Sequence, residues 1–351
     1  MSILILGGTG FIGRRLVPLL AKRGEEIVCM DINPQTANFS DYGKQVRVIR
    51  GDVSQFDDVM SAMANAKPSR VINLAYWLGS EHPPRVAFKL NILGMDNCFE
   101  AARVSGVNRV AYASSLAVSG EQKFYGDRLV TEEDFRHGHV QYAMHKIFNE
   151  WQAQDYREKH GMEITAIRPA NVTGPDKIVG SVDHVYCITT PARGKPVSFP
   201  YKDAMRCPVH VDEIAEIFAR VIMTDKPKHM AYSTGGQAIS MGELADIVRE
   251  FLPDLAQRTL IAAQTELAVG ETFGNGQAPP LVDGRIEREQ AFPVQCGEIG
   301  IGTADERGHW VLRDNEGTEV TAERLLRPLF CLRAGRRYDA DAPILPVAQA
   351  A

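Results

Sequence analysis

The stretch "GGTGFIG", residues 7–13, decides the fold, because it joins a short aliphatic run to an amphipathic segment. Gly7, Gly10 and Gly13 recur at a spacing of three, just after the aliphatic run ends at Leu6. Glycine weakens regular structure, so three of them in one stretch require a tight turn, a close backbone approach or a bound ligand. The sequence that follows the loop bears on which of these reasons applies.

Strand and helix patterns alternate through the first half of the chain. Aliphatic runs predict strands at residues 3–6, 26–30, 46–49, 70–74, 107–113 and 162–167. The spacing of apolar residues predicts helices at residues 11–23, 56–66, 86–104, 142–160, 211–223 and 241–251. Short apolar strands that alternate with helices indicate a parallel sheet covered on both faces. The predicted fold class is therefore α/β, a doubly wound parallel sheet of the Rossmann type, whose ligands bind beyond the carboxyl ends of the strands.

The context of the glycine loop favours a ligand over a purely structural turn. Helix N-termini present unpaired N–H groups and positive dipole character, which suit a pyrophosphate, and glycines let the backbone approach it. Asp31 ends the next predicted strand, eighteen residues after Gly13. A carboxylate there accepts hydrogen bonds from both ribose hydroxyls and repels a 2′-phosphate, which favours NAD over NADP. The alternatives are a structural strand-to-helix turn for the loop and a turn carboxylate for Asp31.

The regular alternation breaks after about residue 170, where proline and glycine become frequent. We expect residues 1–170 to form the NAD-binding Rossmann domain, and residues 171–300 to form a smaller, irregular substrate-binding lobe interleaved with it. All twelve lysines lie in residues 1–228, and periodicity is poor beyond Glu266. Residues 301–351 are therefore predicted to be a loosely ordered tail with no assigned fold.

Composition argues against several classes of function. The net charge is −5 and no run of lysine or arginine stands out, so a nucleic acid or an anionic membrane has no electrostatic support as a partner. The six cysteines are scattered without a CxxC pair, which is typical of reduced thiols in a cytoplasmic protein and argues against a disulfide framework or a metal site. No apolar run approaches ~20 residues, so no transmembrane helix is expected. The apolar start lacks the basic region of a signal peptide.

A tyrosine and a lysine lie four residues apart in "YAMHK", which places Tyr142 and Lys146 on one face of a predicted helix. A nearby ammonium and an oxidised nicotinamide both favour the phenolate. We therefore expect a lowered pKa for Tyr142 and proton exchange with a substrate hydroxyl. Ser115, in "YASSLAVSG" just past a predicted strand, can orient the same substrate oxygen. The alternatives are an ordinary exposed pair and a serine that satisfies a turn.

Nine motifs occur in an order and spacing that resemble one known family. They are "GGTGFIG" at 7–13, Asp31, "GDV" at 51–53, "NLA" at 73–75, Asn91, "ASS" at 113–115, YxxxK at 142–146, "RPANVTGP" at 168–175 and "RCPVHVDEIA" at 206–215. Over about residues 1–250 the sequence resembles an extended short-chain dehydrogenase/reductase of the NAD-dependent epimerase/dehydratase family. The resemblance implies an epimerase-like enzyme with NAD as cofactor, a nucleotide sugar as substrate, and a homodimer built on two long helices.

The resemblance also implies a role for each matching position. The catalytic set is Ser115, Tyr142 and Lys146. The substrate is bound by Ser115, Asn171 and Arg206, and the last two touch its diphosphate. A guanidinium fork suits that group; the alternative for Arg206 is a surface salt bridge. The cofactor is bound by Gly7, Gly10, Phe11, Ile12, Gly13, Asp31, Asp52, Val53, Leu74, Ala75, Asn91, Tyr142 and Lys146.

The sequence departs from the family pattern in three places. Ser119 stands where the family often has tyrosine, Tyr76 and Trp77 stand where smaller residues are common, and the tail from about Gln295 matches no family ending. These departures leave the identity of the substrate open.

Three functions compete for this sequence. The first is a nucleotide-sugar epimerase, which oxidises a hydroxyl and reduces the keto form from the other face. The second is an NAD(P)-dependent dehydrogenase or reductase of a non-nucleotide alcohol or ketone. The intact set of Ser115, Tyr142 and Lys146 argues against the third, a cofactor sensor without catalysis. A 4,6-dehydratase is disfavoured because Leu116 and Ala117 follow Ser115, where those enzymes carry an Asp-Glu pair.

Overall fold

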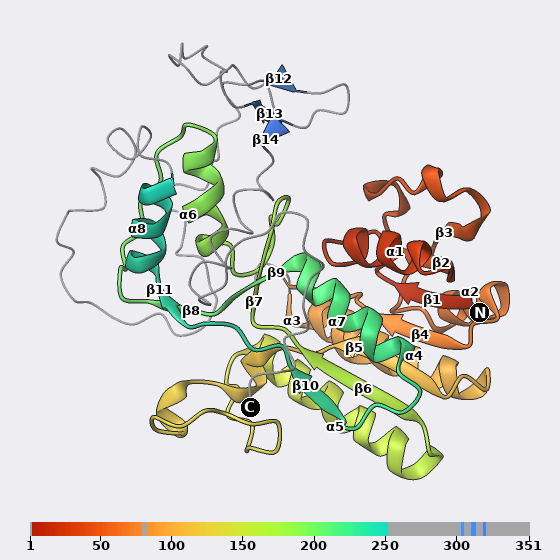
Figure 1. The fold of residues 1–351 in the computed structure, drawn as a ribbon. Coiled ribbons are helices and arrows are strands. Elements are labelled where there is room, and N and C mark those ends of the chain that lie inside the picture. The colour runs from red at the N-terminus through yellow and green to blue at the C-terminus, as the bar shows by residue number, and fades with distance from the viewer. Residues whose placement is uncertain (1, 79–82, 252–302, 305–309, 314–318, 321–351) are drawn as a thin grey trace. The chain divides into compact units, whose positions relative to one another are not determined.

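The computed structural model describes residues 2–78, 83–251, 303–304, 310–313 and 319–320 (Figure 1). The described chain forms two compact units. The first unit contains the chain up to Val172 and the segment Cys207–Ala238. The second contains Thr173–Arg206 and the part that begins at Ile239. The glycine loop and its predicted sheet lie in the first unit.

A seven-stranded sheet organises the first unit, and every neighbouring pair in it is parallel. The spatial order is β10-β6-β5-β4-β1-β2-β3, which confirms the doubly wound α/β fold class. The strands are β1 (Ser2–Leu6), β2 (Glu26–Asp31), β3 (Val46–Arg50), β4 (Arg70–Asn73), β5 (Arg109–Ala113), β6 (Glu163–Arg168) and β10 (Ala231–Ser233). Three-residue β10 has no pattern long enough to predict it. The strand order reverses between β1 and β4, where such a sheet binds its ligand.

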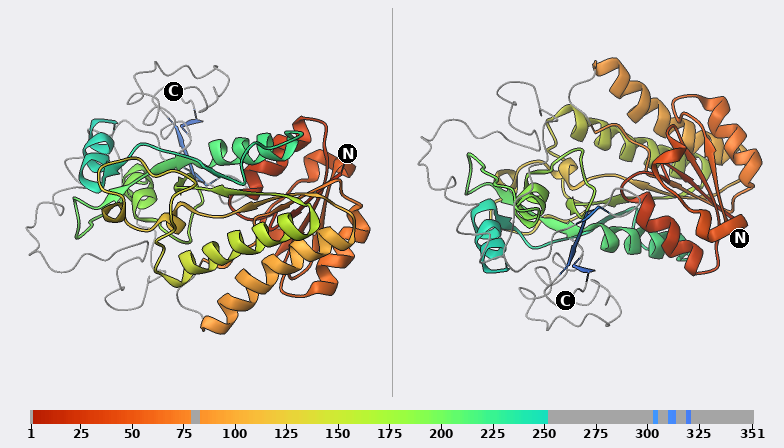
Figure 2. Two further views of the ribbon diagram at one scale, coloured as in Figure 1. Left: turned by 90° about the horizontal axis from the view of Figure 1, so that it is seen from below. Right: turned by 90° about the horizontal axis from the view of Figure 1, so that it is seen from above.

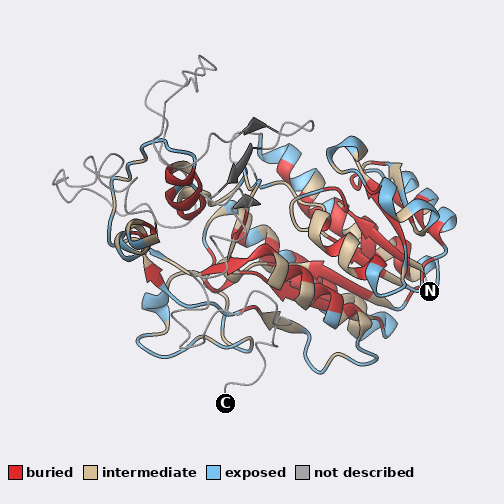
Figure 3. Ribbon diagram, turned by 45° about the horizontal axis from the view of Figure 1, so that its top comes forward, coloured by how far each residue is buried: buried red, intermediate tan, exposed pale blue. Residues whose placement is uncertain are grey.

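Helices cover both faces of this sheet (Figure 2). The helices α2 (Phe56–Ala66), α4 (Gly94–Val104) and α5 (Gln141–His160) pack on one face, and α1 (Gly13–Lys22) and α7 (Val211–Met223) pack on the other. The central strand shows why both faces are apolar. Leu4 and Leu6 enter the first core and Ile3 and Ile5 the second, because successive side chains of a strand point to opposite faces. The inner strands of the sheet are accordingly mostly buried, whereas the edge strands β3 and β10 are less so (Figure 3).

The predicted helix at residues 86–104 is interrupted. It consists of α3 (Pro84–Phe88), a π-helical turn η3 (Lys89–Leu93) and then α4. Asn91 lies in this turn and is buried. Single π turns inside helices are frequent at functional sites, because they re-aim one side chain without ending the helix.

Shorter elements connect these parts. They are η1 (Pro34–Thr36), η2 (Ser40–Gln45), η4 (Leu116–Ser119), η5 (Gln122–Phe124) and the paired strands β7 (Asn171–Thr173) and β9 (Pro208–His210). His210 and Glu213 form a capping box at the start of α7, which gives this histidine a structural role. None of the described helices is long and apolar enough to cross a membrane.

The second unit contains α6 (Asp183–Ala192), α8 (Met241–Phe251) and the antiparallel pair β8 (Met205–Arg206) and β11 (Ile239–Ser240). Its core includes Cys187 and Ile188 of α6 and Leu244 and Val248 of α8. Helix α6 was not predicted, because its "TTPA" end reads as a turn. The unit also holds a small sheet of β12 (Thr303–Ala304), β13 (Trp310–Arg313) and β14 (Glu319–Val320), where no fold was predicted. The rest of the predicted tail, and residues 252–300 of the predicted lobe, lie outside the described residues.

Candidate active site

The three regularly spaced glycines of the loop each lie close to other backbone atoms. Gly7 has a φ of +77°, and a Cβ on it would lie 2.7 Å from the backbone nitrogen of Ala75. A Cβ on Gly13 would lie 2.3 Å from the carbonyl oxygen of Gly8, and one on Gly10 would lie 3.2 Å from the carbonyl oxygen of Gly7. The loop backbone therefore packs on itself and on the segment after β4, at the point where the strand order reverses.

The glycine loop leads directly into α1. Among the described contacts, no side chain caps the N-terminus of α1, where Phe11 and Ile12 precede the first helical residue. The first N–H groups of a helix have no partner within the helix, so they suit an anion. The loop and this helix end form a cradle that could hold an anionic group.

Asp31 is held beside that cradle. Its carboxylate accepts the N–H of Thr9, in the glycine loop, at 3.2 Å and the N–H of Asn33 at 3.0 Å. A carboxylate has about four lone-pair positions. Two backbone donors therefore fix the group and leave it able to accept hydrogen bonds from a ribose.

The other residues assigned to the cofactor lie at the same carboxyl edge of the sheet. Asp52 and Val53 follow β3, and the side chain of Val53 is buried. Leu74 and Ala75 follow β4, and the N–H of Leu74 donates to the carbonyl of Leu6 at 2.8 Å. This bond joins the ends of the two strands between which the order reverses.

The three predicted catalytic residues come together at the end of β5. Tyr142 and Lys146 lie in the first turns of α5, and a hydrogen bond joins the hydroxyls of Tyr142 and Ser115. Ser114 is engaged elsewhere, since its hydroxyl donates to Glu150 at 2.6 Å. Of the two serines in "ASS", Ser115 is therefore the one placed at the phenol.

The pKa of Tyr142 does not follow the sequence prediction. Burial raises it, and the hydrogen bond with Ser115 only partly opposes that rise. The predicted lowering is wrong for this structure because burial of the phenol has the largest effect on its pKa, while the ammonium of Lys146 lies against other groups. Its Nζ is 5.7 Å from the ring centre of Tyr142, but 3.2 Å from that of Tyr76 and 2.5 Å from the carbonyl oxygen of Ala113.

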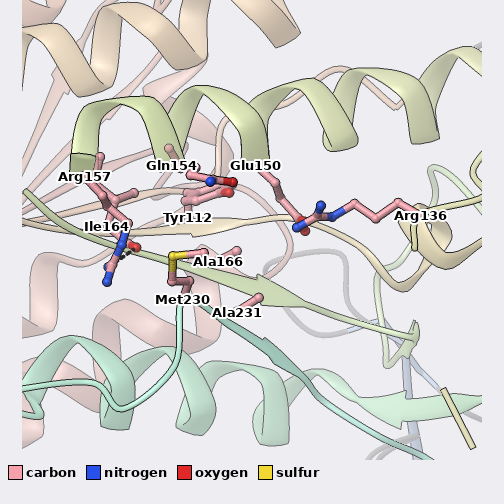
Figure 4. A pocket seen from close by; sticks show the side chains of 10 residues that line it. Tyr112, Arg136, Glu150, Gln154, Arg157, Ile164, Ala166, Met230 and Ala231 are labelled. Carbon is pink, nitrogen blue, oxygen red and sulfur yellow. Dashed lines mark hydrogen bonds and ion pairs between the residues drawn. The ribbon is translucent and has the colours of Figure 1, made fainter. Parts of the chain in front are cut away.

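Glu150, one turn beyond Lys146 on α5, forms a buried charge cluster that the sequence did not reveal. Its carboxylate accepts two hydrogen bonds from Arg168, both at 2.8 Å. It accepts a third from Arg136 at 2.7 Å (Figure 4). Burial alone would raise the pKa of Glu150, but the arginines and Ser114 bring it below its usual range. The only sequence signal was its spacing of four from Lys146.

Asn91 fixes the backbone after β4. Its side-chain oxygen accepts the N–H of Trp77 at 2.7 Å, and its side-chain nitrogen donates to the carbonyl of Trp77 at 3.1 Å. The same nitrogen lies 3.4 Å from Nδ1 of His145. The π-helical turn thus points the side chain of Asn91 toward the segment of residues 74–78 that follows β4.

Arg206, in the second unit, forms an ion pair with Asp183. Its Nε lies 3.1 and 3.0 Å from the two carboxylate oxygens, and its Nη2 also donates to Asp183. Burial would raise the pKa of Asp183, but His184 and Arg206 hold it well below its usual range. The pair is more buried than the surface salt bridge considered from the sequence, with side chains 19% and 11% exposed. Tyr201 also donates to Asp183, at 3.1 Å.

Asn171, in the first unit, holds two segments together. Its side-chain oxygen accepts the N–H of Cys207 at 2.8 Å, and its own N–H donates to the carbonyl of Cys207 at 2.9 Å. The structure therefore gives this residue a role in fixing β7, which the sequence did not predict.

The chain is similar in sequence to known proteins. The chain is 27% identical to Protein CapI of Staphylococcus aureus over 236 residues, 63% of this chain and 69% of that protein. It is 28% identical to the UDP-glucose 4-epimerase of Lacticaseibacillus casei over 194 residues, which span 52% of this chain and only 56% of that enzyme.

Among solved structures, the UDP-glucose 4-epimerase of Thermus thermophilus in complex with NAD is similar at a TM-score of 0.63. It shares 27% identity, over 71% of this chain and 83% of that one. The family model described as "NAD dependent epimerase/dehydratase family" matches residues 3–235. This family uses NAD, which confirms the cofactor predicted from the sequence. The chain belongs to the NAD-dependent epimerase/dehydratase family of extended short-chain dehydrogenases/reductases.

Proposed function

We propose that this enzyme is an NAD-dependent epimerase of a nucleotide-diphosphate sugar, similar to UDP-glucose 4-epimerase. The observation that carries the proposal is the cluster of Ser115, Tyr142 and Lys146 at the carboxyl edge of β5. It lies in the same unit as the glycine cradle and Asp31, so the groups for proton transfer and for the cofactor share one sheet edge.

The roles follow from the chemistry of the three side chains. Tyr142 takes the proton of the sugar hydroxyl as it is oxidised and returns it when the keto form is reduced. Ser115, already bonded to Tyr142, donates to the same substrate oxygen and holds it in line. Lys146, about one helical turn after Tyr142 on α5, supplies a positive charge near the phenol. NAD, when bound, supplies first the oxidant and then the reductant, so no net redox change remains.

The cofactor would be held by residues at the edge where the strand order reverses. In this proposal the cradle of the glycine loop binds the pyrophosphate, and Asp31 binds the adenine-side ribose. The remaining groups are the ones assigned from the sequence: Phe11, Ile12, Asp52, Val53, Leu74, Ala75, Asn91, Tyr142 and Lys146. Asn91 contributes by fixing the loop of Ala75 through Trp77.

Arg206 and Asn171 are the proposed contacts to the substrate diphosphate. Arg206 offers a planar donor fork, and Lys177 adds a second cation in the same unit, where it interacts electrostatically with Asp183. Burial lowers the pKa of Lys177 to about 8. In this proposal a diphosphate replaces part of the interaction that Arg206 now makes with Asp183.

A dehydrogenase or reductase acting on a non-nucleotide alcohol or ketone is the second candidate. One observation favours it: the charge of Arg206 is already balanced by Asp183, which lowers the attraction for a diphosphate. Such an enzyme would keep the roles of Ser115, Tyr142 and Lys146, and would release the cofactor in the other oxidation state: NADH when it oxidises an alcohol, and NAD when it reduces a ketone.

Thermal-shift measurements with NAD present distinguish the two candidates. UDP-, GDP- and dTDP-sugars are compared with the free sugars and with simple secondary alcohols. An epimerase gains stability from one nucleotide sugar and much less from the matching free sugar, because the diphosphate carries much of the binding. Equal stabilisation by a simple alcohol, with none from any nucleotide sugar, would support the dehydrogenase.

We also propose that the enzyme is a homodimer. On α5 the apolar side chains of Met144, Phe148 and Trp151 recur at helical spacing and are exposed, with Trp151 at 57%. Phe88, 56% exposed, and Trp151 line a single groove between the two long helical segments. A second copy would cover this apolar stripe.

Analytical ultracentrifugation of two variants of α5 tests the dimer. Trp151→Glu places a charge in the stripe and should give a monomer. Gln154→Glu adds the same charge at an exposed position outside the stripe and should stay dimeric. A monomeric wild type, or two variants that behave alike, would contradict the proposed interface.

A further inference from the structure

The aromatic ring of Tyr76 lies directly on the ammonium of Lys146. The distance from Nζ to the ring centre is 3.2 Å, well within the range of a cation–π contact. The same ring meets that of Tyr142 edge-on, with centres 5.6 Å apart and an angle of 88° between the planes. Tyr76 is thus in contact with both members of the YxxxK pair at once.

The backbone on each side of Tyr76 is fixed. Before it, the N–H of Ala75 donates to the side chain of Asn73 at 3.0 Å. After it, Trp77 is held at both its N–H and its carbonyl by Asn91. The ring is therefore placed by its framework. Its own hydroxyl is buried and has no hydrogen-bond partner among the described residues, so the hydroxyl does not hold it there.

Lys146 needs such a partner because it is almost fully buried, at 1% exposure. Burial pushes its pKa well below the usual range, and only Glu150 opposes this. Glu150, however, is already bound by Arg168 and Arg136, which offset its charge. The closest groups that stabilise the charged form are then the carbonyl of Ala113 and the ring of Tyr76.

We propose that Tyr76 is a positioning residue, whose ring keeps Lys146 charged and directs its ammonium along the wall of the site beside Tyr142. An ammonium has three N–H groups. One donates to Ala113 and the ring covers another side, which leaves one direction for a ligand hydroxyl. The contact itself belongs to the protein alone; its consequence for catalysis rests on the proposed function.

A nuclear magnetic resonance titration tests the contact without substrate or cofactor. The chain has twelve lysines, so Hε–Cε correlations of carbon-13-labelled lysine give few signals, and Lys146→Arg assigns the one of interest. In the wild type the ring current of Tyr76 should move the Hε signals of Lys146 upfield. Tyr76→Phe keeps the ring and should keep this shift, whereas Tyr76→Leu should abolish it.

The same spectra report the charge of Lys146. Loss of the ring should lower the titration midpoint of Lys146 by about one pH unit, since a desolvated cation–π contact favours the ammonium to that extent. Tyr76→Phe should leave the midpoint within about 0.3 unit of wild type. The titratable neighbours of Lys146 that remain in every variant are Tyr142, His145 and Glu150 on α5, with Arg168 bound to Glu150. Tyr112 on β5 interacts electrostatically with Tyr76 and Glu150.

A Hε shift like that of exposed lysines in the wild type would overturn the proposal. So would an unchanged midpoint in Tyr76→Leu. Should Tyr76→Leu fail to fold, Tyr76→Met provides the same non-aromatic comparison.

The pH profile of kcat/KM measures the catalytic consequence. Its alkaline limb, where Lys146 loses its proton, should move down by about one unit in Tyr76→Leu and stay in place in Tyr76→Phe. The spectra do not depend on which reaction the enzyme catalyses. If the proposed substrate class is wrong, the spectra still test the contact between Tyr76 and Lys146. If the contact is wrong, the proposed substrate class is not affected.

Discussion

Lys146 and Arg206 are both cations that the sequence assigns to a ligand, and the structure gives each a partner within the protein. Lys146 is bound by neutral groups, the carbonyl of Ala113 and the ring of Tyr76. Arg206 is bound by an anion, the carboxylate of Asp183. Neutral partners satisfy the ammonium without cancelling its charge, whereas a carboxylate balances the guanidinium. In the proposed function, the charge of Lys146 therefore remains available to a developing phenolate, whereas Arg206 must exchange the carboxylate of Asp183 for a diphosphate.

The kind of partner also determines which step of the reaction each cation can influence. A charge that stays uncompensated beside Tyr142 acts on proton transfer. A charge that is compensated by Asp183 acts mainly on how tightly another anion competes for it. We therefore expect variants at the first site to alter turnover and variants at the second to alter affinity.

The largest effect is expected for Tyr142→Phe. The ring stays in place and the proton-transferring hydroxyl is lost, so turnover should fall by roughly 10²–10⁴-fold, the usual share of general acid–base catalysis. NAD affinity, measured by fluorescence titration, should change little. Tyr76→Phe removes a neighbouring buried hydroxyl and is the matched control, which should stay near wild type. Activity of Tyr142→Phe within about tenfold of wild type would contradict the proposed role of the phenol in proton transfer.

Arg206→Ala should lower the affinity for the substrate and leave turnover unchanged. Loss of a charge-assisted contact weakens binding by about tenfold to a hundredfold, so the Kd of the preferred UDP-sugar should rise by that factor. NAD affinity should stay near wild type. Lys146→Ala is the contrasting variant, since it should reduce both turnover and NAD affinity. If both variants lowered turnover and left UDP-sugar affinity intact, the division between the two sites would be wrong.

The Arg206–Asp183 pair should also make stability depend on pH. The folded-state pKa of Asp183 is lowered, so the pair stabilises the fold fully above the unfolded pKa of about 3.9. This stabilisation declines as the pH falls from there through the lowered folded-state pKa. Arg206→Ala should cost about 1.5–3 kcal/mol of unfolding free energy at pH 7. Urea denaturation at pH 7 and pH 3 measures the difference, which should shrink at pH 3. A difference that is equal at both pH values would mean that the loss comes from packing and not from charge.

The smallest effect is expected for Asp31→Asn. The carboxylate of Asp31 accepts hydrogen bonds from the backbone N–H groups of Thr9 and Asn33, and among the described residues no cation binds it. The amide no longer repels a 2′-phosphate, so the preference for NAD over NADP should narrow by about tenfold. Titration of both cofactors gives the ratio. Asp41→Asn, on the exposed turn η2, is the control and should leave it unchanged. A wild type that binds NADP as tightly as NAD would remove this role from Asp31.

Much of the first unit could be predicted because its signals are local. Each strand of the central sheet except β10 is a short aliphatic run, and α7 and α8 lie at the predicted residues, since their apolar spacing is regular. The grouping of Ser115, Tyr142 and Lys146 followed from motif order and from where a doubly wound sheet brings strand ends together.

The partners of the two cations could not be predicted, because they depend on packing between distant segments. Tyr76 is 70 residues from Lys146 and reaches it only because β4 lies beside β5. Asp183 begins α6, a helix whose "TTPA" end hides it from a reading of helical spacing. The predicted low pKa of Tyr142 was wrong because the burial of the phenol, which raises its pKa, also depends on packing between distant segments.

The central claim is that the enzyme inverts the configuration at one carbon of a sugar without net redox change. One measurement tests this claim most directly. The preferred nucleotide sugar is incubated with catalytic amounts of the NAD-loaded enzyme, proton NMR follows the sugar, and absorbance at the nicotinamide band follows NADH. An epimerase converts the substrate over many turnovers while NADH never exceeds the amount of enzyme. Steady accumulation of free NADH with added NAD and a simple alcohol, without epimerised sugar, would contradict the proposal and identify a dehydrogenase.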